Sequence, residues 1–290
     1  MPVLELSDGR SLEYQVSGPE GGRVLLFHHG TPGSAHQMEF STEAVHRHGW
    51  RLVTVSRPGS ARSTRLPGRT VADVVPDAVA VLDALGVGRF VVAGASGGGP
   101  HALACAALLP DRVDAAQAIC SAAPYDADGL DFLAGMGDDN VTEFGLALEG
   151  EAALRPWLDE HMPALRTASA EQIVEELASI LPEVDRACLR GDLGEQFARA
   201  MHSAASGTSD GWLDDDLAFT RAWGFDLAAI EVPVSLWQGT EDLMVPFSHG
   251  QWLAAHIPGV RSHLEEGEGH LSLTVGAIDR MLDELDDLAG

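Results

Sequence analysis

The chain has 290 residues, a formal net charge of −26 at pH 7 and no lysine. Such an acidic surface offers no basic patch for phosphate, so it excludes nucleic acid and anionic membranes as partners. No apolar run reaches the roughly 18 residues of a membrane-spanning helix. The three cysteines, Cys105, Cys120 and Cys188, give no disulfide framework. We therefore expect a globular protein of the cytoplasm.

Short apolar runs alternate with amphipathic segments in the first part of the chain, which predicts a mostly parallel sheet with helices on both faces. The expected elements are a hairpin of 4–6 and 12–17, strands over 23–28, 52–56, 90–95 and 115–121, and helices over 37–48 and within 71–85. Thr70 and Asp73 have the spacing of a capping box. Pro76 either kinks the helix that follows or marks its true first turn.

The strand over 24–28 ends in the loop His29-Gly30-Thr31-Pro32-Gly33-Ser34. This loop is either an ordinary turn, for which Gly, Pro and Ser are common, or part of an oxyanion hole. An oxyanion hole needs two N–H donors aimed at one oxygen. By position, the backbone N–H of Thr31 is the best candidate for one of them.

The pentapeptide Gly94-Ala95-Ser96-Gly97-Gly98 lies between an apolar strand and a helical pattern. A G-x-S-x-G in this context predicts a nucleophile elbow, in which small residues allow a tight turn and the serine hydroxyl is exposed. The alternative is a glycine-rich turn whose serine only caps a helix. In the first interpretation Ser96 is the nucleophile, and the N–H of Gly97 is the other oxyanion donor.

Residues 125–225 contain helical patterns and no convincing strand. A segment of this length is too long for a simple crossover between two strands. We interpret this segment as a cap inserted over the active site. Its large apolar residues are interpreted mainly as cap core rather than substrate contacts: Phe132, Met136, Phe144, Trp157, Met162, Met201, Trp212, Phe219 and Trp223. The acidic run Asp214-Asp215-Asp216 is interpreted as a solvated face.

An acid and a histidine follow downstream, in the order that a G-x-S-x-G hydrolase requires. Asp242 lies in the loop that leaves the predicted strand at 234–238, and His270 lies on a glycine-rich loop before a helix expected from about 272. Asp126, just past the strand at 115–121, is the reserve candidate for the acid. Each residue alone would be an ordinary turn or loop residue, but their order favours a Ser96–His270–Asp242 triad.

These motifs, with Arg57-Pro58-Gly59, resemble those of the α/β-hydrolase fold serine hydrolases of the capped H-G-x-P type, in particular an uncharacterised bacterial subgroup. Many relatives carry Asp where this chain has Ser56, a position that is usually structural. The resemblance implies an α/β-hydrolase core of residues 1–124 and 226–290 with a helical cap of 125–225. It also implies a cis peptide bond between Thr31 and Pro32.

The expected function is hydrolysis of a small-molecule carboxylic ester or lactone through an acyl-enzyme on Ser96. An aminopeptidase or amidase, a C–C bond hydrolase, a thioesterase and a perhydrolase remain open, because the same triad serves them all. A hydrolase-fold receptor that binds a ligand without catalysis is the alternative from outside the enzymes. No cofactor is expected, and the twelve histidines lack metal-ligand spacing. The expected partner is a small acyl substrate, and a homodimer is compatible with the sequence.

Overall fold

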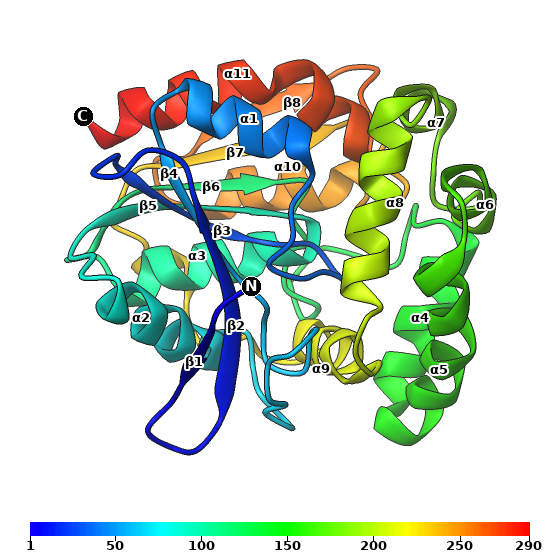
Figure 1. Cartoon of the computed structure of the whole chain (residues 1–290). Helices are drawn as coiled ribbons and strands as arrows, with labels where there is room; N and C mark the ends of the chain where they lie inside the picture. Colours follow the sequence, from blue (N-terminus) through cyan, green and yellow to red (C-terminus); the bar gives the residue numbers. More distant parts are fainter.

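A computed structural model describes all residues, 1–290, and contains one eight-stranded sheet with helices on both faces (Figure 1). The strand order is β1-β2-β4-β3-β5-β6-β7-β8, in which β1 and β2 are antiparallel and the others run parallel. The strands are β1 (Val3–Glu5), β2 (Ser11–Ser17), β3 (Val24–His28), β4 (Arg51–Val55), β5 (Phe90–Ala95), β6 (Val113–Ile119), β7 (Val234–Gly239) and β8 (Arg261–Glu265). The predicted α/β-hydrolase architecture is confirmed.

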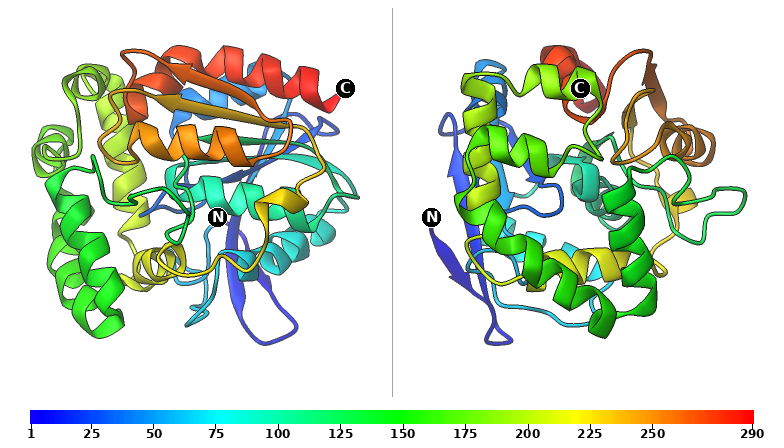
Figure 2. Two further views of the ribbon diagram at one scale, coloured as in Figure 1. Left: turned by 180° about the vertical axis from the view of Figure 1, so that it is seen from behind. Right: turned by 90° about the vertical axis from the view of Figure 1, so that its right-hand side faces the viewer.

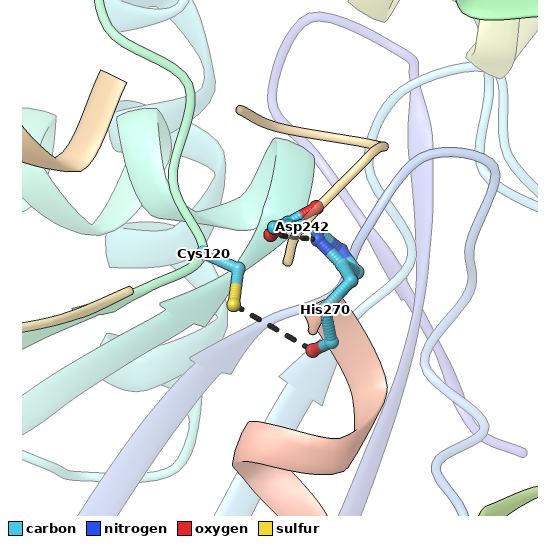
Figure 3. A group of neighbouring side chains, drawn as sticks. All are labelled: Cys120, Asp242 and His270. Carbon is cyan, nitrogen blue, oxygen red and sulfur yellow. Dashed lines mark hydrogen bonds and ion pairs between the residues drawn. The ribbon is translucent and has the colours of Figure 1, made fainter. Parts of the chain in front are cut away.

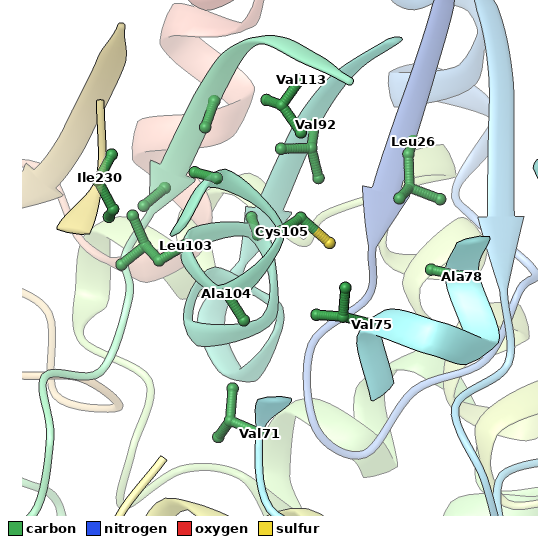
Figure 4. Packing of buried hydrophobic residues seen from close by; sticks show 14 of the residues in the cluster. Leu26, Val71, Val75, Ala78, Val92, Leu103, Ala104, Cys105, Val113 and Ile230 are labelled. Atoms are coloured by element: carbon green, nitrogen blue, oxygen red, sulfur yellow. The ribbon is translucent and has the colours of Figure 1, made fainter. Parts of the chain in front are cut away.

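Five helices cover the two faces of the sheet (Figures 1 and 2). Helices α1 (Glu39–Arg47) and α11 (His270–Ala289) lie on one face, and α2 (Val75–Ala84), α3 (Gly99–Leu108) and α10 (Phe247–His256) lie on the other. The largest hydrophobic cluster fills the space between the sheet and the helices α2, α3 and α10. Figure 4 shows part of this cluster. Strand residues that are apolar on both faces are expected for a sheet buried in this way.

The predicted capping box at Thr70 and Asp73 is only half formed, and it lies before the short 3-10 turn Ala72–Val74 that leads into α2. The Thr70 hydroxyl donates to Asp73 rather than accepting a backbone N–H, so the turn and α2 have no side-chain cap. The N–H and hydroxyl of Thr70 donate to Asp73 at 2.7 and 2.8 Å. Pro76 lies in the first turn of the helix, where its missing N–H costs no hydrogen bond, so it marks the true first turn rather than a kink. At the other end of the chain, α11 begins at His270 itself, slightly earlier than the expected start near residue 272.

Between β6 and β7 the chain forms helices and no strand. We call residues 125–225 the helical insertion. Its helices are α4 (Asp138–Glu149), α5 (Glu151–Thr167), α6 (Ala170–Glu176), α7 (Glu183–Cys188), α8 (Asp192–Ala204) and α9 (Asp210–Phe219). They gather at one end of the sheet (Figure 2).

The carboxyl ends of the parallel strands lie at this same end. The register aligns His28 of β3 with Gly94 of β5, so the loops after these two strands are neighbours. The loops after β7 and β8 belong to the same edge because both strands continue the parallel sheet. In open α/β sheets, this is the edge at which ligands bind. None of the helices combines the length and the apolar character needed to cross a lipid bilayer.

Candidate active site

Ser96 stands on the tight turn between β5 and α3, with a backbone φ of 56°. A Cβ added at Gly94 would collide with the carbonyl of Gly98, and one at Gly98 would collide with the carbonyl of His28. Only glycine therefore permits strand and helix to approach this closely. The left-handed conformation of a non-glycine residue is typical of a strained functional turn. Ser96 is partly exposed and lines a cavity of about 450 Å³.

Asp242 and His270 are joined by a hydrogen bond of 2.8 Å between Oδ2 and the ring Nδ1. Asp242 is 3% exposed, and each of its carboxylate oxygens has further donors. Gln238 Nε2 donates to Oδ2 at 3.0 Å, and the N–H groups of Met244 and Val245 donate to Oδ1 at 2.9 and 2.8 Å. The carboxylate is therefore held in one orientation.

Two opposing influences act on the imidazole of His270. Burial lowers its pKa, because the charged form loses its water. The charge of Asp242 and its hydrogen bond act against burial and prevail, with a smaller contribution from Asp185, so the pKa of His270 is raised above its usual value. The reserve candidate Asp126 is exposed and makes no contact of this kind, so the structure pairs His270 with Asp242.

The hydroxyl of Ser96 and the imidazole of His270 line the same cavity but form no hydrogen bond in this structure. Such bonds between a nucleophile and its base are often long without substrate. The predicted arrangement of Asp242 on one ring nitrogen is found. The predicted approach of Ser96 to the other ring nitrogen stays a prediction.

Cys120 lies beside this pair, at the end of β6, and one polar atom from each of Cys120, Asp242 and His270 lies within 4.8 Å of the others (Figure 3). The Cys120 thiol is 3.5 Å from the carbonyl oxygen of His270, to which it donates. Burial, together with the nearby Asp242 charge, raises the pKa of Cys120 well above its usual value. The same surroundings disfavour the thiolate, which is the nucleophilic form of cysteine.

The loop after β3 contains the predicted cis peptide bond between Thr31 and Pro32. It passes beside the nucleophile turn, because a Cβ on Gly30 would lie 3.8 Å from Ser96 Oγ. A Cβ on Gly97 would instead collide with the Thr31 hydroxyl. The side chain of Thr31 therefore lies against Gly97, so the two residues proposed as oxyanion donors are neighbours.

The side chain of Arg57 holds this loop in place through hydrogen bonds, a role that the sequence did not reveal. Its guanidinium donates to the carbonyl of His29 at 2.5 Å and to the carbonyl of Gly30 at 2.9 Å. It also donates to the hydroxyl of Thr31 at 3.0 Å. The backbone on the N-terminal side of Thr31 is therefore fixed by a buried side chain from the loop after β4.

The charge of Arg57 is balanced by Asp215 of α9, at 2.5 Å from Nη2 to Oδ2. Asp215 also pairs with Arg69 at 2.5 Å and accepts the Thr31 hydroxyl at 2.7 Å. Burial alone would raise the pKa of Asp215, but the two guanidinium groups hold it well below its usual value.

The interpretation of Asp214-Asp215-Asp216 as a solvated face is wrong, since all three are at most 2% exposed. The arginine partners lie far away in sequence, so local charge patterning could not indicate their burial.

Asp185 of α7 was also missed by sequence reasoning. It is fully buried and accepts the N–H groups of His270, Leu271 and Ser272 at 2.9, 3.0 and 2.8 Å. These are the first N–H groups of α11, which have no acceptor within the helix. A carboxylate there is favoured by the helix dipole as well. The insertion therefore supplies the cap of the helix that carries His270.

The cavity has a volume of about 450 Å³ and lies between the strand ends and the helical insertion. Seven of the nine large apolar residues that we interpreted mainly as cap core line it: Phe132, Met136, Phe144, Trp157, Met201, Trp212 and Phe219. Met162 and Trp223 do not. All seven also belong to buried hydrophobic clusters or pack against them, so the same residues form both the core of the insertion and the wall of the cavity. Helical spacing identifies an apolar face but not what the face covers.

Comparison with known proteins agrees with this architecture. A family model described as alpha/beta hydrolase fold matches residues 23–277. An uncharacterised hydrolase of Bacillus subtilis, YcgS, is 29% identical over 272 residues, which cover 91% of this chain and 89% of that protein.

Solved structures show the same fold at lower identity. A hydrolase from Pseudomonas aeruginosa PA01 has a TM-score of 0.70 at 23% identity, covering 100% of this chain and 98% of its own. An enol-lactonase from Burkholderia xenovorans LB400 has a TM-score of 0.67 at 17% identity, covering 99% of both chains. The family and the curated relative support a hydrolase activity.

Proposed function

Because the chain belongs to the alpha/beta hydrolase fold family, we propose that it is a capped serine hydrolase of the H-G-x-P type. In this proposal it cleaves a small-molecule carboxylic ester or lactone through an acyl-enzyme on Ser96. The observation that carries the proposal is the buried Asp242–His270 hydrogen bond in the wall of the cavity that Ser96 also lines. No cofactor is needed for this chemistry.

The mechanism starts with attack of Ser96 Oγ on the acyl carbonyl. His270 Nε2 takes the hydroxyl proton while Asp242 holds Nδ1–H and stabilises the imidazolium. The N–H groups of Thr31 and Gly97 donate to the tetrahedral oxyanion. His270 then protonates the leaving alkoxide, and a water molecule repeats the sequence on the acyl-enzyme to release the acid and restore Ser96.

The cavity itself favours a small-molecule ester or lactone over a polymeric substrate. Its volume of about 450 Å³ is that of a small-molecule site, and its lining is mostly hydrophobic. The helical insertion closes over the nucleophile and serves as the cap of residues 125–225, which limits the length of chain that can reach Ser96. The enol-lactonase from Burkholderia xenovorans LB400 shares only the fold with this chain, and comparing initial rates on esters and lactones distinguishes the two substrate classes.

The first prediction tests the nucleophile. A fluorophosphonate probe should label the wild-type protein on Ser96, and Ser96→Ala should abolish labelling. Turnover of p-nitrophenyl butyrate should fall by several orders of magnitude, since the triad acts as a unit. Intact mass spectrometry and initial rates provide the two measurements.

Ser206→Ala is the matched control, because Ser206 is an exposed serine of the insertion, and its labelling and rates should equal those of the wild type. Unlabelled wild-type protein without esterase activity would favour the non-catalytic receptor. Activity on amino-acid anilides in place of esters would favour the amidase alternative.

A further inference from the structure

A small pocket lies on the sheet face that α1 and α11 cover (Figure 1). We call it the side pocket, and its walls include Ala93, Gln117, Ile278 and Met281. Its volume is about 60 Å³, and ten of its fourteen lining residues are hydrophobic. One buried water molecule needs only about 10–15 Å³, but it also needs two or more polar partners. The side pocket is therefore large enough for several atoms and better suited to an apolar group than to water.

The side pocket exists because β5 carries small side chains. The register places Ala93 between Phe27 of β3 and Gln117 of β6, and the three side chains line the same pocket. Nε2 of Gln117 donates to the Ser235 hydroxyl and to the carbonyl of Met281, each at 2.9 Å, so this side chain is held in the wall. The methyl group of Ala93 is too small to fill the space between its two larger neighbours.

The side pocket adjoins the cavity that contains Ser96. Six residues line both spaces: Phe27, Gln37, Ser41, Ala95, Ile119 and Thr274. On β5, Ala95 lines both, and Ala93, two positions further from the nucleophile, lines the side pocket alone. On α11, Thr274 lines both, and Ile278, one turn further along, lines the side pocket alone. Side chains two apart on a strand and four apart on a helix share a face. The side pocket therefore extends the cavity along the sheet, and its rim begins one residue before Ser96.

We propose that the side pocket binds the end of an unbranched aliphatic chain of the substrate, so that the hydrolase acts on esters with a hydrocarbon tail of medium length. A saturated chain has no polar atom that would lose its hydrogen bonds in such a lining. Each methylene group that enters the pocket strengthens binding by about four-fold. The chain belongs to the acyl or to the alcohol part of the ester, and the test distinguishes these two sources. This substrate class rests on the hydrolase function proposed above.

The test compares kcat/KM for p-nitrophenyl acetate and p-nitrophenyl octanoate in the wild type and in Ala93→Leu. The substitution adds three carbons to a wall of the side pocket that is not part of the main cavity. The value for octanoate should fall about ten-fold or more, because at least two methylene groups lose their place. The value for acetate, whose chain is too short to reach the pocket, should stay within about two-fold. Ethyl and octyl acetate form the parallel series with the chain on the alcohol side. Loss in the first series assigns the pocket to the acyl chain, and loss in the second assigns it to the alcohol.

Ile278→Ala widens the same pocket, so the preferred chain should become longer. This variant also keeps the proposal testable if Ala93→Leu does not fold by circular dichroism. Leu288→Ala is the matched control, because Leu288 lies on the same helix and packs against the same hydrophobic cluster but lines neither space. Its chain-length profile should equal that of the wild type. An unchanged ratio of long-chain to short-chain kcat/KM in both series for Ala93→Leu, or an unchanged preferred length for Ile278→Ala, would overturn the proposal.

Binding of 1-octanol separates this inference from the hydrolase function. By calorimetry, 1-octanol should bind about ten-fold more weakly to the Ser96→Ala, Ala93→Leu protein than to the Ser96→Ala protein. Equal affinities in these two proteins would contradict the assignment of the side pocket. Absence of turnover on every ester, together with the expected loss of affinity, would instead contradict the hydrolase function and leave the aliphatic-chain site intact.

Discussion

The imidazole of His270 shows how a single residue balances burial against charge. Its protonated form is favoured by Asp242 strongly enough to outweigh the loss of water. A general base must be neutral to accept a proton, so a raised pKa keeps the inactive imidazolium present to a higher pH. The acidic limb of kcat/KM should therefore lie above the ordinary histidine value of about 6.5.

Asp242→Asn separates these two influences. The substitution removes the attraction but leaves the burial, so the pKa of His270 should fall and the acidic limb should move to lower pH. The rate itself should drop by about 10⁴-fold, as expected when the imidazole loses its orienting carboxylate. The measurement is a pH–rate profile with a p-nitrophenyl ester, in which an unmoved limb would mean that another group titrates. Asp126→Asn is the control, and its profile should match the wild type.

At the scale of single elements, α11 depends on a carboxylate from another part of the chain. Asp185 of α7 accepts three N–H groups at the start of the helix whose first residue is His270. In Asp185→Ala these donors stay buried without an acceptor. The expected cost is roughly 2 kcal/mol in unfolding free energy, at the upper end for an N-cap. It should be visible as a lower Tm and a lower kcat.

The control for this change is Glu183→Ala on the same short helix. Glu183 has a side chain that is 81% exposed and lies 3.7 Å from Arg190, so its loss should change stability by less than about 0.5 kcal/mol. Asp185→Asn keeps one acceptor oxygen and should recover part of the stability and part of kcat. A similar loss of Tm in the Glu183 and Asp185 variants would argue against the capping role.

Much of this element-level organisation could be predicted, because it depends on neighbours in sequence. The glycines around Ser96 and the order of strands and helices are both local signals. Asp185, Arg57 and Asp215 carry no such signal. Asp215 and Arg57 are 158 positions apart, and nothing in either segment distinguishes a buried partner from a surface charge.

At the scale of the whole molecule, the ion cluster of Arg57, Arg69 and Asp215 joins the helical insertion to the core. Asp215→Asn would leave two buried guanidinium groups without a counter-charge, which should cost about 3–5 kcal/mol in unfolding free energy. The pKa of Asp215 is held well below its usual value, so its contribution to stability is present above about pH 4 and is lost as the pH falls further.

Urea unfolding at pH 7 and at pH 3 measures both parts of this prediction. The difference in unfolding free energy between wild type and Asp215→Asn should be large at pH 7 and smaller at pH 3. Asp279→Asn removes an exposed carboxylate beside Arg47 and should have little effect at either pH. An equal difference for Asp215→Asn at both pH values would show that its carboxylate charge does not carry the effect.

The placement of Asp185 and Asp215 also bears on how such a protein can diversify. Both belong to the insertion, yet one holds the start of the helix bearing His270 and the other holds the loop bearing Thr31. A chimera that received residues 125–225 from a relative would lose the contacts of both Asp185 and Asp215. It would keep them only if the relative's segment carried a carboxylate at each of these two positions. New substrate preferences are therefore more accessible by substitutions on the cavity wall than by exchange of the whole segment.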